Sequence, residues 1–169
     1  MYNLDNTSVK VIIEGCHDCV INLNAPILTQ FIELINCSRL TLGLFSSIRT
    51  MSIDQSKSVN IRIHSMADIA NCVVNACSDL SYELDGKRVH VPLERMSVDW
   101  AKMEQVVIHR QDGKLIVEKA ARLGVYLTTE SEVKKLEQQV IRERRAIESA
   151  LMRMMGLHTH CEGDIPVLA

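Results

Sequence analysis

Short runs of alternating hydrophobic and polar residues fill the first half of the chain and repeat there in a fixed register. Four stretches between about residues 8 and 84 align at offsets of 21, 19 and 21 residues, so that one type of side chain recurs in each. The recurring columns are Val11, Ile32, Met51, Cys72; Ile13, Leu34, Ile53, Val74; Cys16, Cys37, Ser56, Cys77; Cys19, Leu40, Val59, Leu80; Ile21, Leu42, Ile61, Tyr82; and Leu23, Leu44, Ile63, Leu84.

Each stretch has the two-residue period of half-buried strands, because polar residues such as Lys10, Asn22 and Thr41 separate the apolar ones. Every repeat is therefore expected to form two short strands with a corner between them. A unit of about 20 residues cannot bury its apolar face without a neighbour. The pattern predicts an all-β fold, a right-handed parallel β-helix of about four coils. An antiparallel sandwich is the alternative, which six columns with shared offsets disfavour.

The rest of the chain departs from this period. Asp85-Gly86 is expected to close the repeats, and a loop or a single helical turn is expected from Leu93 to Met103. A β-hairpin is predicted next, because β-rich runs at 106–110 and 115–119 flank a central Asp112-Gly113. We expect a β-helix domain with this hairpin over residues 1–121, and a helical appendage with a flexible tail over 122–169.

A helix of about 27 residues is predicted from Thr129, which forms a capping-box pattern with Glu132. Its apolar residues recur every three or four positions: Val133, Leu136, Val140, Ile147, Leu151 and Met154. Two interpretations stay open: the helix docks on the β-helix, or it forms a short coiled coil with a partner or a second copy. Glu143 and Arg144 interrupt the heptad of the coiled coil.

Composition narrows the class of protein. With 47% hydrophobic residues the 169-residue chain has enough apolar side chains for a core. A net charge of −2 and the absence of basic runs interleaved with aromatic residues argue against nucleic acid as a partner. Apolar runs are too short for a membrane span, and the first residues lack the pattern of a signal peptide. We expect a cytoplasmic protein.

Most of the six cysteines are expected to be free thiols, because the cytosol is reducing and most of them fall in core columns. Cys16 and Cys19 form one CxxC, but a structural zinc site needs two further ligands at a matching spacing. His158, His160 and Cys161 lie in the tail, where disorder is expected in place of a metal site. No metal and no cofactor are predicted.

Residues 9–120 resemble the C-terminal domain of cyclase-associated proteins, within the superfamily that includes tubulin-folding cofactor C. The resemblance rests on motifs at 15–19, 31–37, 50–54, 91–94 and 112–117: GCHDC, FIELINC, TMSID, VPLE and DGKLIV. It implies a β-helix that dimerises through its C-terminal hairpin and binds monomeric actin, assisting nucleotide exchange. The hairpin residues expected in the dimer are Val106, Ile108, Leu115 and Val117. The chain departs from the family at 55–58 and 78–82, stretches linked there to actin contact.

The proposed actin-contacting set combines two groups of residues. Ser52, Asp54 and Ser78 lie in the stretches that the resemblance covers, while the other members are apolar residues that alternation places on the outside: Ile12, Phe31, Ile35 and Val73. A protein of this kind acts by contact between surfaces, and no nucleophile with a partner base or phosphate-binding loop is recognisable for an enzyme.

Two other functions are consistent with the sequence. A GTPase-activating protein of the cofactor C type would use Arg49 as its arginine finger, although the glutamine that precedes this arginine in that family is replaced by serine here. A dimeric scaffold or adaptor would instead recruit a partner through the helix from Thr129.

Overall fold

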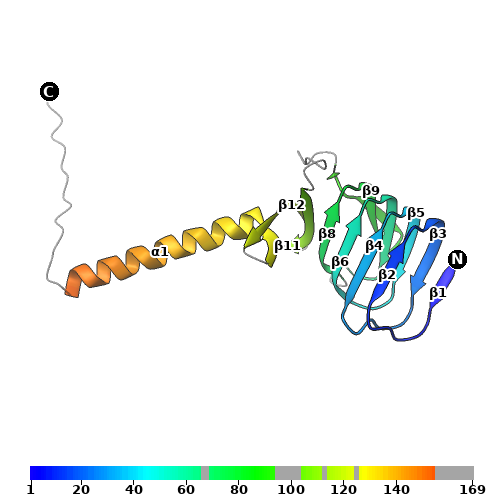
Figure 1. The fold of residues 1–169 in the computed structure, drawn as a ribbon, viewed down its shortest axis with the longest axis horizontal. Coiled ribbons are helices and arrows are strands. Elements are labelled where there is room, and N and C mark those ends of the chain that lie inside the picture. Colours follow the sequence, from blue (N-terminus) through cyan, green and yellow to red (C-terminus); the bar gives the residue numbers. More distant parts are fainter. Residues whose placement is uncertain (66–68, 94–103, 112–113, 124–125, 155–169) are drawn as a thin grey trace, which may run out of the picture. The chain divides into compact units, whose positions relative to one another are not determined.

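The computed structural model describes residues 1–65, 69–93, 104–111, 114–123 and 126–154 (Figure 1). The expected loop or helical turn up to Met103, the hairpin turn at 112 and 113, and the tail from 155 onward lie wholly or mostly outside these residues. The chain divides into two units, Met1–Glu130 and Ser131–Ala169. Each is described by itself below.

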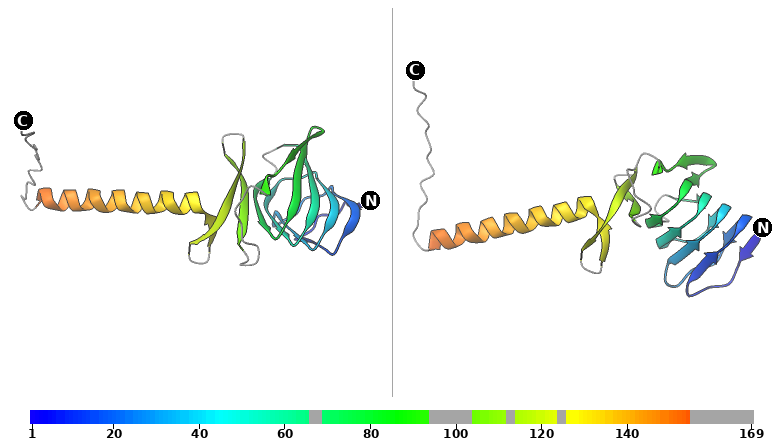
Figure 2. Two further views of the ribbon diagram at one scale, coloured as in Figure 1. Left: turned by 90° about the horizontal axis from the view of Figure 1, so that it is seen from above. Right: turned by 45° about the horizontal axis from the view of Figure 1, so that its top comes forward.

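The first unit is a β-solenoid of four turns, each with two strands. One sheet contains the parallel strands β2 (Val11–Glu14), β4 (Phe31–Ile35), β6 (Ile48–Asp54) and β8 (Ile69–Asn75). The other contains β3 (His17–Leu23), β5 (Ser38–Leu44), β7 (Lys57–Ile63) and β9 (Ser78–Leu84). The short strand β1 (Tyr2–Leu4) pairs parallel with the end of β3 and is the first strand of this sheet. Figure 2 shows the successive turns side by side, from blue to green.

Four of the six predicted columns are confirmed in full by the strand register. Val11, Ile32, Met51 and Cys72 are matched from turn to turn, as are Ile13, Leu34, Ile53 and Val74. In the other sheet the matched residues include Cys19, Leu40, Val59, Leu80 and Ile21, Leu42, Ile61, Tyr82. Like side chains stack inside the coil because hydrogen-bonded strands lie about 4.8 Å apart.

The stacked side chains form one apolar core. Met51, Ile61 and Leu42 have no exposed surface. Five described cysteines are free thiols, as predicted, and burial raises the pKa of Cys72 to about 12 and of Cys77 to about 11. These two thiols therefore stay protonated and unreactive at neutral pH.

The corners between the two sheets repeat as faithfully as the strands. Ser38 N–H donates to the carbonyl of Cys16 at 2.9 Å, and Lys57 and Ser78 repeat this bond one and two turns later. Two residues at each of these corners have positive φ, namely Gly15, Asn36, Gln55, Ala76 before the corner and Asp18, Arg39, Ser58, Asp79 after it. Only one of these eight is glycine, so the repeated backbone hydrogen bonds hold a conformation that most side chains disfavour.

Strands after the last turn close its open edge. Asp85 and Gly86, both with positive φ, connect β9 to the antiparallel strand β10 (Lys87–His90). Strand β11 (Gln105–Gln111) pairs antiparallel with β8, β12 (Lys114–Leu123) pairs with β11, and β13 (Tyr126–Thr129) pairs with the end of β12. Val106 lies against Val74 and Ile108 against Cys72, so β11 extends two core columns by one residue each.

The second unit contains all but the first residue of helix α1 (Glu130–Met154), which begins directly after Thr129 as the capping-box pattern predicts. None of its residues is buried. Within the described part of the chain, no helix has the length and apolar character needed to span a bilayer.

Replacing Ala76 by glycine is expected to stabilise the solenoid. The left-handed conformation costs a non-glycine residue about 1–2 kcal/mol, and the greater freedom of glycine in the unfolded chain offsets about 0.5–1 kcal/mol of that gain. We expect Ala76→Gly to raise the free energy of unfolding in urea by about 0.5–1 kcal/mol. Ala25→Gly, at a buried position without positive φ, should lower it; equal losses in both variants would contradict the argument.

Candidate functional site: the outer face of the β2, β4, β6, β8 sheet

The outward side chains of β2, β4, β6 and β8 form a continuous surface, called the outer face here. Strand register arranges them in three rows: Ile12, Glu33, Ser52, Val73; Glu14, Ile35, Asp54, Asn75; and Phe31, Thr50, Asn71. The rows lie outside because their sequence neighbours fill the core, and successive side chains of a strand point to opposite sides.

Six of the seven residues proposed for partner contact lie on the outer face. Ile12 is 55% exposed, and Phe31, Ile35 and Val73 are half-buried. Ser52 and Asp54 lie between these apolar residues and are half-buried as well. Ser78 is exposed but begins β9, so the corner after Asn75 separates it from the outer face.

A cation fixes one end of the outer face. Lys10 Nζ lies 2.8 Å from a carboxylate oxygen of Glu33 and 4.7 Å from the centre of the Phe31 ring. An exposed cation–π contact of this kind contributes about 0.5–1 kcal/mol. The Phe31 ring is therefore held against the sheet by a contact that sequence alternation does not reveal.

A buried polar pair lies at the other end of the face. Asn75 Nδ2 donates to Asp54 Oδ1 at 2.6 Å, and Asn75 is 8% exposed. Asn75 Oδ1 has no hydrogen-bond partner among the residues that the structure describes. An unpaired buried carbonyl oxygen costs about 1–3 kcal/mol, which offsets part of the gain from the bond to Asp54.

Arg49, proposed as an arginine finger, is exposed on β6, and its backbone N–H donates to Gln30 O at 2.9 Å. The described contacts of this residue include no bond that would aim the guanidinium at a bound phosphate.

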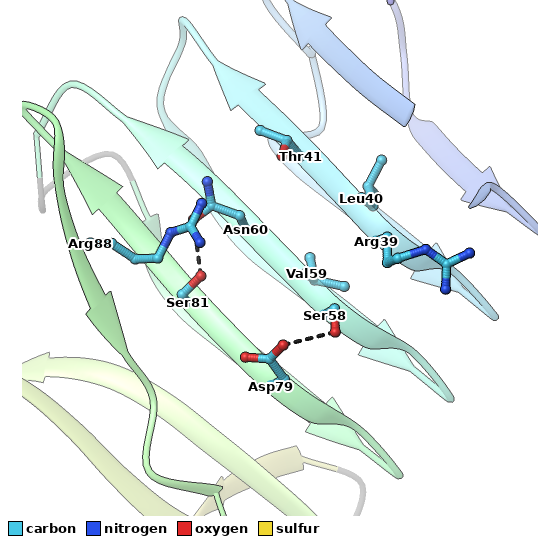
Figure 3. Close-up of a pocket in the computed structure, with 9 residues that line it drawn as sticks. All are labelled: Arg39, Leu40, Thr41, Ser58, Val59, Asn60, Asp79, Ser81 and Arg88. Carbon is cyan, nitrogen blue, oxygen red and sulfur yellow. Dashed lines mark hydrogen bonds between the residues drawn. The ribbon is translucent and has the colours of Figure 1, made fainter. Parts of the chain in front are cut away.

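The opposite sheet carries a polar groove that the sequence analysis missed (Figure 3). Its volume is about 250 Å³, and strands β5, β7, β9 and β10 supply its lining, which includes Arg39, Asn60, Asp79, Ser81 and Arg88. The groove side chains largely bond one another: Ser58 Oγ donates to Asp79 at 2.7 Å, and Ser81 Oγ donates to Asn60 at 2.9 Å. Arg39 is already paired with Asp18.

Glu83 lies beside the groove and collects three partners. Asn60 Nδ2 donates to its Oε2 at 2.7 Å, Arg62 Nε donates at 3.3 Å, and Arg88 lies 3.8 Å away. The Asn60 hydrogen bond is the main reason that the pKa of Glu83 is lowered, with Arg62 and Arg88 adding to the effect.

The residues proposed for the hairpin dimer divide into two pairs. Val106 and Ile108 on β11 are 0% and 2% exposed, since they complete core columns of their own chain. Leu115 and Val117 on β12 are half-buried against the same core. On the side of β12 away from β11, residues 114–117 have no strand partner within the described part of the chain.

No group of three or more metal-ligating side chains occurs among the described residues. Comparison with family models, with curated proteins and with solved structures found no match for this chain. The arrangement that the described residues offer is a contact surface with exposed and half-buried apolar groups, set between carboxylates and amides.

The lowered pKa of Glu83 predicts a contribution to acid sensitivity. A carboxyl with a depressed folded-state pKa stabilises the fold above its unfolded pKa of about 4.3, and this stability is lost as the pH falls through the folded value. The midpoint of urea unfolding should therefore fall less between pH 7 and pH 3 in Glu83→Gln than in the wild type. Asp85→Asn, which removes a carboxylate of the adjacent turn, should keep the wild-type slope. If Glu83→Gln also keeps it, Glu83 is not a source of acid sensitivity.

Proposed function

We propose that this protein binds an actin monomer through the outer face and regulates it by contact, without bond chemistry of its own. The proposal combines the sequence resemblance with one structural observation: four apolar side chains expected to face outward are grouped on a single sheet with Ser52 and Asp54 between them. Exposed apolar groups bordered by polar ones are typical of protein interfaces.

The size of the outer face indicates how a partner would use it. Four strands spaced about 4.8 Å apart and about five residues long cover on the order of 250 Å², a third of the area that one partner contributes to a standard interface. The contact must extend beyond the sheet, and Ser78, exposed just past the corner, lies on one such extension. The outer face would then supply the desolvated centre of the interface.

The proposal includes a right-handed coil and a homodimer. Parallel crossover connections are right-handed almost without exception, and a crystal structure would establish the hand here. Because β11 is committed to the core of its own chain, the hairpin would dimerise through the free side of β12, where one edge strand pairs with the same strand of a second copy.

The dimer predicts a specific change in hydrogen exchange. Backbone amides of residues 114–117 that point away from β11 should exchange slowly in the dimer and rapidly when the chain is diluted, because pairing protects them. Amides on β11 should be protected at both concentrations, since they bond to β8 in the same chain. Rapid exchange on the free side of β12 at every concentration would contradict a dimer through this edge.

The actin contact predicts a loss of affinity when the outer face is charged. We expect Ile12→Glu to weaken binding to fluorescently labelled actin monomers at least about tenfold, which is about 1.4 kcal/mol, because it places a charge in the apolar centre of the contact. Val89→Glu is the matched control, since Val89 is 51% exposed on β10 and lies in the other sheet. The rate of nucleotide exchange on actin should follow the same order.

Two results would contradict this proposal. Failure of the folded wild type to bind actin monomers would remove actin as the partner. Loss of partner binding in Leu136→Lys on α1, with full binding in Ile12→Glu, would favour the alternative function, a dimeric adaptor that recruits its partner through the helix. This alternative is supported by the exposure of the apolar side chains of α1.

A further inference from the structure

Helix α1 has an apolar stripe whose residues are largely exposed. The stripe comprises Val133, Leu136, Val140, Ile147, Leu151 and Met154, and the last five are 43%, 62%, 61%, 50% and 85% exposed. At 100° per residue these side chains and the intervening Glu143 and Arg144 stay within an arc of about 100°. Two other exposed apolar residues, Ile141 and Met152, lie more than about 100° from the centre of the stripe.

Glu143 and Arg144 interrupt the strict heptad without breaking the stripe. The spacings from Val133 through Arg144 to Met154 are 3, 4, 4, 3, 4 and 3 residues. The first three sum to 11, a repeat that matches a nearly straight helix better than seven does. The stripe therefore presents one continuous face over the whole helix, with one layer of charge at its middle.

An amphipathic helix of this kind is only marginally stable by itself, because helices gain most of their stability from packing an apolar face. We propose that α1 pairs with α1 of a second copy of this chain, in parallel and in register. Val133, Val140 and Ile147 follow one another at intervals of seven, and β-branched residues at this heptad position favour two parallel strands. This inference does not depend on actin binding.

The charges at the middle of the stripe distinguish the two orientations. Glu143 and Arg144 flank the stripe on opposite sides, and intrahelical bonds hold both in place, from Gln139 Nε2 to Glu143 at 2.8 Å and from Arg144 Nε to Glu148 at 2.9 Å. In a parallel pair, opposite flanks face each other, so each Glu143 opposes Arg144 of the other copy. In an antiparallel pair, like flanks meet, and Glu143 opposes Glu143.

Other flanking charges reduce this preference without reversing it. Glu132 and Glu137 flank opposite sides near the start of the helix and oppose each other across a parallel pair, at a cost similar to the gain from the central pairs. An antiparallel pair instead brings Glu137 of one copy to the level of Glu148 of the other. This repulsion adds to the repulsion between the two Glu143 side chains at the centre of the pair. The parallel arrangement is therefore the better of the two.

Cross-linking of the full chain tests both the pairing and its orientation. In Val140→Cys the two new thiols face each other in a parallel, in-register pair, so mild oxidation should yield several-fold more covalent dimer than Ile141→Cys, whose position lies off the stripe. Wild-type protein gives the background from native cysteines. Non-reducing electrophoresis and intact mass measure the yield. A dimer through β12 alone would not raise the cross-linking yield of one variant above that of the other. Selective cross-linking of Val140→Cys is therefore independent of the proposed β12 dimer.

Two outcomes would overturn the inference. Equal cross-linking of Val140→Cys and Ile141→Cys would show that the stripe does not pair with itself. Selective cross-linking between Val140→Cys and Ile147→Cys chains in a mixture, with little in either variant alone, would show an antiparallel pair.

The central charges supply a second test in the same background. Glu143→Arg and Arg144→Glu, each added to Val140→Cys, should both reduce the yield several-fold, because each places like charges opposite one another. Mixing the two double variants should restore it, since each arginine then faces a glutamate. A yield that neither substitution changes would contradict the facing charges.

Discussion

The structure depends on the hydrogen-bonded stacking of each strand on the equivalent strand of the previous turn. Once that register is set, every inward side chain contacts its counterpart one turn away, as Ile21, Leu42, Ile61 and Tyr82 do. A shift by one residue would turn each apolar column toward water. The corners obey the same constraint, because the residue after each corner donates to the carbonyl of the corner below.

The same constraint arranges the surface. Outward residues of consecutive turns also lie side by side, so Ile12, Glu33, Ser52 and Val73 form one row although about 60 residues of chain separate the first from the last. The polar groove on the other sheet arises in the same way from the row Thr41, Asn60 and Ser81. A contact surface on a solenoid is thus distributed over the sequence, which explains why no compact motif announces it.

Periodicity predicted the four turns, the core columns and the outward position of six partner-contact candidates, since each follows from alternation within a strand. It could not predict contacts that depend on side-chain reach, such as Lys10 over Phe31 or Asn75 bonded to Asp54. Strand β10 was missed for a different reason. Asp85-Gly86 was interpreted as the end of the repeats, although the same dipeptide at 112 and 113 was taken as a hairpin signal. The groove, lined in part by Arg88 of β10, was missed with it.

The corners have a consequence for how such a domain changes over evolutionary time. Seven of the eight positive-φ positions at the corners are occupied by residues other than glycine. At the first such position of a corner, the backbone N–H donates to a backbone carbonyl of the next turn. Because the scaffold is secured by main-chain atoms and by inward side chains, the identities of outward residues are left nearly unconstrained by folding. One coil can thereby acquire a different binding specificity through surface substitutions alone, while its backbone path stays the same.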